Sequence, residues 1–195
     1  MKTAICKLKS YSPLTFSKVV TELRKPKESH EAYEERTWKQ RAHVNREGYV
    51  IIPGIMIQNA IKAAAKYLSK QIPGKGKATF TKNFEAGIYI EYDYPLPIKI
   101  EDVKASEVFV PSDGVRGSGK RVWKKFPTIE EWEITIKVII FDDIIDSETF
   151  VEAIDTAGFL IGIGSWRPRN SGRNGMFSVE LLEWNDDVPL NFIKK

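Results

Sequence analysis

The stretch IIPGIMIQNAIKAAAKYL, residues 51–68, decides the fold of this chain. Apolar side chains recur along it at three- and four-residue spacing, at Ile57, Ile61, Ala64, Ala65 and Leu68. That spacing is typical of an amphipathic helix, and it predicts one over residues 55–70. The apolar residues 50–52 indicate a short strand before it, and Pro53-Gly54 supplies the turn between the two elements.

Outward from this unit, alternating apolar side chains indicate further strands over residues 2–9, 87–94, 103–110, 130–141 and 176–184. A second helix is expected over residues 147–158, where Ser147 is an N-cap candidate. The order is therefore β–β–α–β–β–β–α–β. We expect an α+β fold of modified ferredoxin-like type, with two main helices on an antiparallel sheet and long basic loop insertions.

The chain has 195 residues, of which 42% are hydrophobic, and this is enough for the core of one domain. We expect residues 1–195 to form that domain, with a charged insertion at 24–47 and a basic loop or hairpin at 111–127. Within the insertion, residues 28–40 are compatible with a helix whose only large apolar residues are Tyr33 and Trp38. We therefore interpret the insertion as exposed, or as a helix lying on the surface.

The cysteine content and the apolar runs bear on the cellular compartment. No apolar run approaches the roughly 20 residues that span a bilayer, and lysines interrupt the N-terminal segment where a signal peptide would be apolar. Cys6 is the only cysteine, so no internal disulfide can form, and we interpret it as a core or strand residue rather than a nucleophile. These features predict a cytoplasmic protein without a membrane partner.

The basic residues are unevenly distributed along the chain. Residues 66–84, 115–125 and 165–175 together hold 13 of the 30 Lys and Arg and none of the 26 Asp and Glu. The rest of the chain is net acidic. Such segregation favours a binder of an anionic polymer, because the field of the cations adds where the phosphates lie. The alternative is that each lysine-rich loop is simply solvated.

The most informative segment is GIGSWRPRNSGRNG, residues 162–175. Its glycines allow a close approach of the backbone to a ligand, and the guanidinium groups of Arg167, Arg169 and Arg173 suit phosphate oxygens. Trp166 is a candidate for stacking on a base. The segment is not a dinucleotide-binding fingerprint, because Arg167 stands where GxGxxG needs its third glycine. An ordinary surface loop before a strand is the alternative.

Two further segments, residues 115–125 and residues 73–84, combine Lys or Arg with glycine and aromatic residues. The first supplies the candidate residues Arg116, Lys120, Arg121, Trp123, Lys124 and Lys125. The second supplies Lys75 and Lys77, close to Phe80 and Phe84. Basic residues with interspersed aromatics fit single strands better than duplex, because unpaired bases offer faces for stacking. GVRGSGK, residues 114–120, has P-loop spacing, but Arg121 follows where Ser or Thr would hold magnesium, and Pro127 comes too soon for the helix.

Three patches of the chain resemble the RAMP superfamily, the repeat-associated proteins that form the backbone of CRISPR effector complexes. Residues 51–68 are similar to that family's strand, Pro-Gly turn and helix, with Ile52, Pro53, Gly54, Ala60, Ile61 and Lys62 at matching places. SYSPLTFS, residues 10–17, resembles the end of its first strand, and residues 162–179 resemble its glycine-rich loop before the last strand. The chain departs from the family where residues 55–57 replace the usual serines, so the resemblance does not carry over contacts to RNA by the helix N-terminus.

The resemblance implies an RRM-related, ferredoxin-like fold that binds RNA along its backbone without sequence preference. It also implies that copies assemble side by side on the strand, as a homo-oligomer or filament. The general look of the chain is similar to solitary proteins of phages and mobile elements.

Catalytic constellations are weak. His30, with Tyr33 and Lys27, resembles the groups that some RNA-cleaving relatives use for general acid–base work, but two surface histidines are the simpler interpretation. The sequence HEAYE lacks the HExxH pattern of a zinc site, so we expect no metal and no other cofactor. Asp142, Asp143 and Asp146 suit either a magnesium ion or a turn and helix cap, and we favour the turn and cap.

The leading hypothesis is a protein that binds single-stranded RNA or DNA without strong sequence preference. Two alternatives stay open. The first is a metal-independent endoribonuclease of the same fold. The second is a structural or inhibitory protein whose basic loops meet an acidic partner protein.

Overall fold

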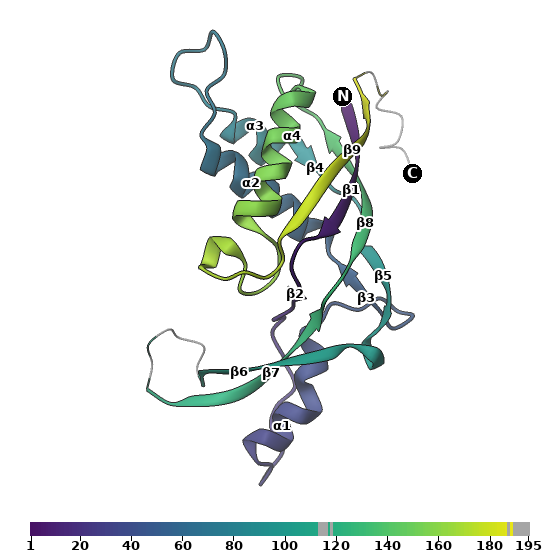
Figure 1. Cartoon of the computed structure of the whole chain (residues 1–195), viewed down its shortest axis with the longest axis vertical. Coiled ribbons are helices and arrows are strands. Elements are labelled where there is room, and N and C mark those ends of the chain that lie inside the picture. Colours follow the sequence, from purple (N-terminus) through teal and green to yellow (C-terminus); the bar gives the residue numbers. More distant parts are fainter. Residues whose placement is uncertain (113–116, 118, 187, 189–195) are drawn as a thin grey trace.

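The central sheet of the molecule is antiparallel and has four strands in the order β4–β8–β1–β9 (Figure 1). The structure is a computed structural model, and it describes residues 1–112, 117, 119–186 and 188. The strands of this sheet are β1 (Lys2–Ser10), β4 (Ile88–Tyr89), β8 (Glu133–Ile140) and β9 (Phe177–Asn185). Helices α2 (Gly54–Leu68) and α4 (Ser147–Thr156) pack on one face of it.

The order of these elements along the chain identifies the topology. The chain runs β1–α2–β4–β8–α4–β9, and β1 lies between β8 and β9 with antiparallel pairing to both. Each helix connects two strands that are not neighbours in the sheet, which is the split β–α–β arrangement of a ferredoxin-like fold. The α+β, ferredoxin-like prediction from the sequence is confirmed. The two helices predicted from hydrophobic spacing and capping are the two that pack on the sheet.

The core lies between the sheet and the two helices. Ala4, Cys6 and Leu8 of β1 are fully buried on the side of the helices, opposite Ile57 and Ile61 of α2. Burial, together with the nearby charge of Asp155, raises the pKa of the Cys6 thiol to about 12, so it packs as an apolar group. The Cys6 prediction therefore agrees with the structure.

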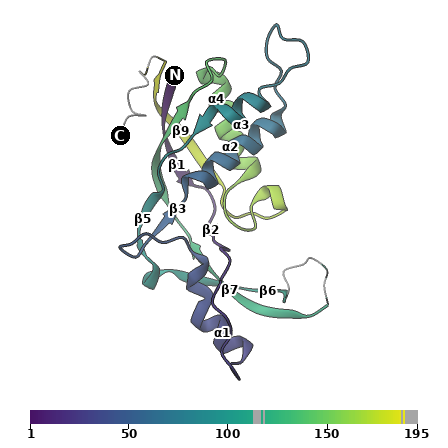
Figure 2. The same ribbon diagram turned by 180° about the vertical axis from the view of Figure 1, so that it is seen from behind.

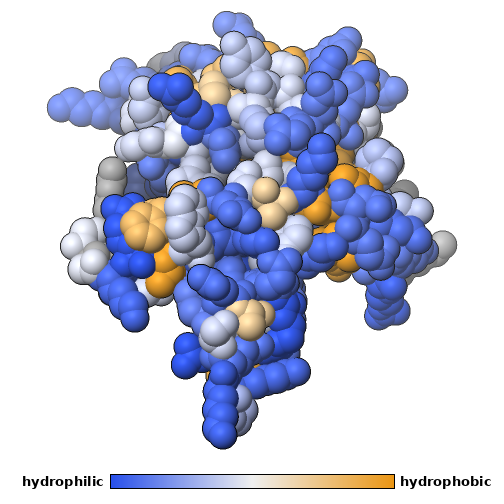
Figure 3. All heavy atoms as spheres, turned by 60° about the horizontal axis from the view of Figure 1, so that its bottom comes forward, coloured by the Kyte–Doolittle hydropathy of each residue, from blue (hydrophilic) through white to orange (hydrophobic). Residues whose placement is uncertain are grey.

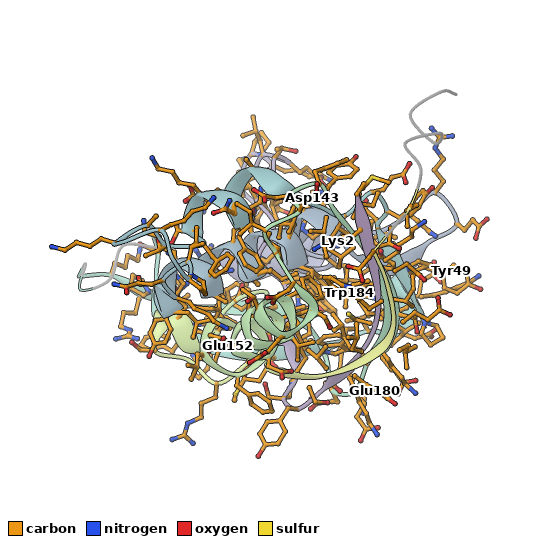
Figure 4. All side chains as sticks on the ribbon, turned by 90° about the horizontal axis from the view of Figure 1, so that it is seen from above. Lys2, Tyr49, Asp143, Glu152, Glu180 and Trp184 are labelled. Carbon is orange, nitrogen blue, oxygen red and sulfur yellow. The ribbon has the colours of Figure 1, made fainter. Side chains whose placement is uncertain are left out.

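The ends of the core elements are fastened by charged residues (Figure 4). Lys2 donates through Nζ to the carbonyl oxygen of Asp143 at 2.9 Å, and the same ammonium lies 5.9 Å from the centre of the Trp184 ring. Lys70 pairs with Glu152 of α4 at 2.7 Å, just beyond the end of α2. These contacts close the sheet at the start of β1 and join the two helices.

Asp146, rather than Ser147, caps helix α4. Its Oδ1 accepts from the backbone N–H of Thr149 at 2.8 Å, and this hydrogen bond holds the pKa of Asp146 below its usual value. Asp142 accepts through Oδ1 from the N–H of Ile144 at 3.0 Å. These aspartates therefore form the turn and cap that the sequence favoured over a magnesium site.

Two insertions extend the core (Figure 2). Between β1 and α2 the chain forms β2 (Leu14–Thr15), α1 (His30–Thr37), the 3-10 turn η1 (Trp38–Arg41) and β3 (Tyr49–Ile52). Between β4 and β8 it forms β5 (Tyr94–Lys99), the turn η2 (Ile100–Asp102), β6 (Lys104–Pro111) and β7 (Arg121–Ile129). Strands β2, β7 and β6 make a second antiparallel sheet, and β3 pairs with β5. Both insertions lie at the end of the molecule opposite the chain termini.

The strand predicted over residues 87–94 is much shorter in the structure, where β4 covers only Ile88–Tyr89. Pairing with β8 lasts only for Ile88 and Tyr89, because the N–H of Ile90 donates to Oε1 of Gln58 on α2 at 3.0 Å. Asp93 then accepts from the N–H of Gly54 at 3.0 Å, so the chain has turned toward the helix. A short helix, α3 (Thr81–Gly87), precedes the strand and was not predicted.

The charged insertion at 24–47 is only partly the exposed segment that its composition indicated. Figure 3 shows a largely hydrophilic surface at this end of the molecule, where α1 projects. The inner side of α1 and η1, however, is buried, through Glu34, Trp38 and Arg41. Among the described residues, no helix has both the length and the apolar character needed to cross a membrane.

Candidate nucleic-acid interface

The three basic segments of the sequence project from the same side of the molecule. This side is on the left in Figure 1 and on the right in Figure 2. The loop between α2 and α3, the loop before β9 and the strands of the β6–β7 hairpin follow one another down the long axis. The fold thus places in one row segments that are about 50 residues apart along the chain.

The middle segment, residues 162–175, is called the glycine-rich loop, and it is fastened to the chain around β2. The N–H of Gly175 donates to the carbonyl of Pro13 at 2.7 Å, and that of Ser165 to the carbonyl of Thr15 at 2.8 Å. Asn174 also donates through Nδ2 to Oγ1 of Thr15 at 2.8 Å. The loop is therefore preformed, and a ligand would not have to order it.

The glycines of this loop serve its own packing more than a ligand. Gly175 has φ +69°, and a Cβ there would lie 1.7 Å from the carbonyl oxygen of Ile163. A Cβ on Gly172 would lie 1.6 Å from the carbonyl oxygen of Trp166. The sequence interpretation assigned these glycines to close approach of a ligand. The structure shows that these glycines instead allow two parts of the loop's own backbone to lie in close contact.

A small cleft of about 190 Å³ lies beside the glycine-rich loop and is called the basic cleft. Its polar lining residues are Ser17, Lys18, His43, Ser165 and Arg167, with Phe16, Met56 and Gly164 completing the wall. Only Arg167 of these was a predicted site residue. Lys18 directly follows the SYSPLTFS segment and His43 lies in the charged insertion, but neither stands in a basic run.

Electrostatics in the basic cleft favour an anion. Burial, and then the neighbouring charge of Arg169, lower the pKa of Arg167, and its Nε is buried without a hydrogen-bond partner among the described residues. Burial and then Lys18 lower the pKa of His43, although Asp93 acts in the opposite direction. An anion in the cleft would relieve both effects, because it offsets the cationic repulsion and gives Arg167 an acceptor.

Trp166 is less available for stacking than the sequence indicated. It has φ +50°, is half-buried, and packs edge-on against Phe126 with 4.6 Å between the ring centres. Phe126 in turn lies 5.2 Å from the guanidinium of Arg41. Trp166 therefore supports the base of the loop, while Arg169 and Arg173 remain exposed.

The hairpin of β6 and β7 is called the arm, and its strands reach into residues 111–127, where the sequence left a basic loop or a hairpin open. Trp123 is 62% exposed, and its ring lies 5.3 Å from that of the exposed Phe109 on the facing strand. The guanidinium of Arg121 lies over the Phe109 ring, 5.4 Å from the ring centre. Trp123 is thus the better placed of the two predicted stacking residues.

The other predicted residues of the arm differ in their freedom. Lys120 is exposed, and Lys124 donates through Nζ to the carbonyl of Ser112 at 3.1 Å. Lys125 is paired with Glu35 at 2.5 Å and with Glu107 at 3.3 Å, so its charge is already balanced within the protein. Arg116 lies outside the described residues. The P-loop spacing is followed by a strand and not by a helix, because Arg121 begins β7.

The charged insertion holds the arm at its base. Glu34 accepts from the backbone N–H of Lys125 through Oε1 at 2.7 Å, and from Arg41 through Oε2 at 3.0 Å. Arg41 also donates to the carbonyl of Lys125 at 3.1 Å. Glu34 and Arg41 are only 4% and 8% exposed. This buried ion pair fixes β7 to α1, a role that the charge-rich sequence did not indicate.

The basic loop with Lys75 and Lys77 and the weak catalytic candidate His30 lie at opposite ends of the molecule. Lys75 and Lys77 are exposed on the loop that projects beyond α2 (Figures 1 and 2). His30 begins α1, and its Nε2 is buried without a partner among the described residues. Tyr33 donates its hydroxyl proton to the carbonyl of Glu22 at 2.7 Å, so that phenol already has a structural role. The histidine that meets cations in a cleft is His43.

The open face of the central sheet offers no comparable site. The side chains of β1 and β8 that alternate with the buried ones are Thr, Ile, Lys and Glu, and none of them is aromatic. Lys7 pairs with Glu133 at 2.9 Å, and that carboxylate raises the pKa of the lysine. RRM domains stack bases on sheet aromatics, and on this face the exposed Tyr89 of β4, in register with Ile139, is such a side chain at the edge of the sheet.

Known proteins were compared with the chain in sequence and in structure. No protein-family profile matches it. No curated protein is related to it in sequence. Its structure is similar to a chain of type III-B Cmr-beta bound to cognate target RNA, at 11% identity and TM-score 0.48, over 94% of this chain and 60% of that one. It is also similar to Cmr6 from Pyrococcus furiosus, at 13% identity and TM-score 0.44, over 90% of this chain and 96% of Cmr6. A chain of a CRISPR RNA-guided surveillance complex is similar at 12% identity and TM-score 0.33, over 91% of this chain and 68% of that one.

The first two of these structures are RAMP-type subunits, the family that three patches of the sequence resemble. The chain spans 60% of the length of the first. At such identities and TM-scores the similarity concerns the course of the chain alone. It does not indicate which side chains bind a ligand.

Proposed function

We propose that this protein binds single-stranded nucleic acid, RNA or DNA, through the phosphate backbone and with little dependence on base sequence. The strand would follow the side on which the three basic segments project. Arginine and lysine side chains of the basic cleft, the glycine-rich loop and the arm would contact phosphates, and Trp123 would stack on a base.

The basic cleft is the observation that carries this proposal. Lys18 and Arg167 line it together with the hydroxyls of Ser17 and Ser165, from segments that are far apart in the sequence. Arg167 lacks a partner for its buried Nε among the described residues, and a phosphate oxygen is a suitable acceptor. The cleft of about 190 Å³ has room for a phosphate group, and contacts to a phosphate carry no base information.

The affinity for a fluorescent single-stranded homopolymer, measured by anisotropy over a range of salt concentrations, tests this function. Neutralising about five phosphates gives a log–log slope of about −3.5, which is about a 100-fold loss of affinity for a fourfold rise in salt. Homopolymers of different bases should bind within a few-fold of each other, and duplex should bind more weakly. An affinity that does not respond to salt would exclude the proposal.

Copies would assemble side by side along a strand, as the family resemblance implies. This part of the proposal makes its own prediction. The mass of complexes on strands of increasing length should rise in regular steps, as measured by analytical ultracentrifugation. A single copy on every length of strand would exclude assembly but would leave binding intact.

One observation favours a second candidate function, a metal-independent endoribonuclease. His43, whose pKa is lowered by burial and then by Lys18, is neutral at pH 7 and lies in the same cleft as Lys18 and Arg167. A neutral imidazole beside cations can accept the proton of a ribose 2′-hydroxyl. Cleavage of RNA by the wild-type protein, lost in His43→Ala with binding retained, would establish it. RNA that stays intact in the complex would remove it.

A further inference from the structure

A groove of about 900 Å³ lies apart from the basic cleft and differs from it in chemistry. It lies between the end of β1, the strand β5 and the turn from β7 to β8. Its size is within the range of sites that hold small ligands or short peptide segments. We call it the acidic groove.

The charged lining of the acidic groove is mostly negative. It includes Glu130, Glu131 and Glu133 against a single cation, Lys9. Glu133 is paired with Lys7, whereas Glu130 and Glu131 are exposed and have no ion-pair partner among the described residues. A nucleic-acid strand would be repelled here, because its phosphates would face these carboxylates.

One lining residue of the groove carries an unsatisfied donor. Trp132 lines it, is 4% exposed, and has a buried Nε1–H without an acceptor among the described residues. An unpaired N–H of this kind costs free energy that an acceptor from a bound molecule would recover. A polyamine carries only donors, whereas a peptide brings carbonyl oxygens together with its cations.

The walls of the groove are apolar. Leu96 and Ile98 of β5, together with Pro13 and Pro97, face it between the charged residues. Pro95 and Pro97 also remove N–H donors from β5, which disfavours an added strand on that side. An occupant would therefore be held by its side chains and by Trp132 rather than by strand pairing.

We infer that the acidic groove binds an extended segment of a partner protein in which cationic side chains alternate with apolar ones. The cations meet Glu130 and Glu131, the apolar side chains meet the β5 wall, and a backbone carbonyl accepts from Trp132. The chain's own exposed basic loop is a poor occupant, because residues 73–77 alternate lysine with glycine and bring no aliphatic side chain. This inference is independent of the proposed nucleic-acid function.

Fluorescence anisotropy of a short labelled peptide in which lysine alternates with valine tests the inference on the full chain. The wild-type protein should bind it, and a peptide with glutamate in place of lysine should not bind. The double variant Glu130→Gln/Glu131→Gln should weaken binding about fivefold or more, because two partly desolvated ion pairs are lost. The matched control Glu85→Gln/Glu101→Gln removes two exposed carboxylates elsewhere and should leave peptide affinity unchanged.

A third variant tests the indole donor apart from the carboxylates. Trp132→Phe keeps an aromatic ring and removes the donor, and it should weaken the peptide about threefold or more. Because the smaller ring also loses some packing against Phe177, the thermal unfolding midpoint should fall modestly while the variant stays folded at the temperature of the binding assay. Affinity for single-stranded nucleic acid should stay unchanged in all three variants.

Three results would overturn the inference. One is equal loss of peptide binding in the control pair. Another is displacement of the peptide by spermine as effectively as by unlabelled peptide, which would mean that the groove attracts any cation. The third is self-association of the wild-type chain that Glu130→Lys/Glu131→Lys abolishes, which would assign the groove to a second copy.

Discussion

The glycine-rich loop and the arm are similar in composition and are built in opposite ways. Both combine arginine, glycine and tryptophan, and both project from the same side of the molecule. The loop is tied to the chain around β2 by backbone hydrogen bonds, and its tryptophan is packed inward. The arm extends as a hairpin, presents Trp123 to solvent, and is held at its base by Glu34 and Arg41. We infer that the loop offers a preformed phosphate site and the arm an adjustable stacking surface.

The largest expected effect concerns the buried Glu34–Arg41 ion pair, which holds the base of the arm. Glu34→Ala leaves the buried guanidinium of Arg41 without its partner, which should cost about 3 to 5 kcal/mol of unfolding free energy. The neighbouring Glu35→Ala removes only an exposed pair with Lys125 and should cost less than about 1 kcal/mol. Urea denaturation measures both. Equal losses of unfolding free energy in the two variants would mean that the buried ion pair stabilises the protein no more than the exposed one.

The next effect concerns the packing of the glycine-rich loop. Gly175→Ala must accommodate a Cβ at 1.7 Å from a carbonyl oxygen, in addition to its positive φ, and should cost about 2 to 4 kcal/mol. Gly74→Ala is the matched control, because it has φ +74° and nothing within 4 Å of the added Cβ. It should cost about 1 kcal/mol. Similar losses in thermal unfolding would show that the loop is less tightly packed than described.

The two tryptophans should separate binding from stability. Trp123→Ala removes an exposed ring and should weaken single-strand binding by about 1 to 3 kcal/mol with little change in unfolding. Trp166→Ala should have the reverse profile, because its ring supports Phe126. Anisotropy and thermal denaturation on both variants provide the comparison. If both lose affinity equally while keeping their stability, the loop stacks on bases as the arm does.

The smallest effect is a dependence of affinity on pH. Burial and Lys18 keep the pKa of His43 below its ordinary value in the free protein, and a bound phosphate would favour the protonated form and raise it. Binding then takes up a proton, so affinity should rise as pH falls from about 7 and should level off once the free protein is protonated too. The rise should not exceed about tenfold for each unit of pKa change.

His43→Gln should abolish this pH dependence, and His30→Gln should keep it, because His30 lies on α1 and outside the cleft. A pH profile that is the same in His43→Gln and in the wild type would contradict the assignment of His43 to the phosphate site.

The parts of the fold that follow from local pattern were predictable. The spacing of Ile57 and Ile61 gave helix α2, and alternation gave β1 and β8. The length of β4 was not predictable, because it ends where the Gln58 side chain takes the N–H of Ile90, a contact across 32 residues. Helix α3 has a single large buried residue, Phe84, and so leaves no periodic signal.

The site was predictable in outline but not in its details. Runs of basic residues identified the loops, yet Lys18 and His43 stand alone in the sequence and meet Arg167 only through the fold. Lys125 belongs to a basic run but is balanced by Glu35 and Glu107 from other elements. Glu34 and Arg41 looked like surface charges, because their burial depends on β7, which lies 91 residues further along the chain from Glu34.

The central claim is that Lys18 and Arg167 hold a backbone phosphate in the basic cleft. The most direct test is the salt dependence of single-strand affinity for Lys18→Ala/Arg167→Ala, compared with wild type and with Lys9→Ala/Lys99→Ala, which removes two exposed lysines outside the cleft, the glycine-rich loop and the arm. The cleft variant should lose at least about tenfold in affinity at low salt, and its log–log slope should be shallower by about 0.7 to 1.4. A slope and an affinity that change no more than those of the control would contradict the claim.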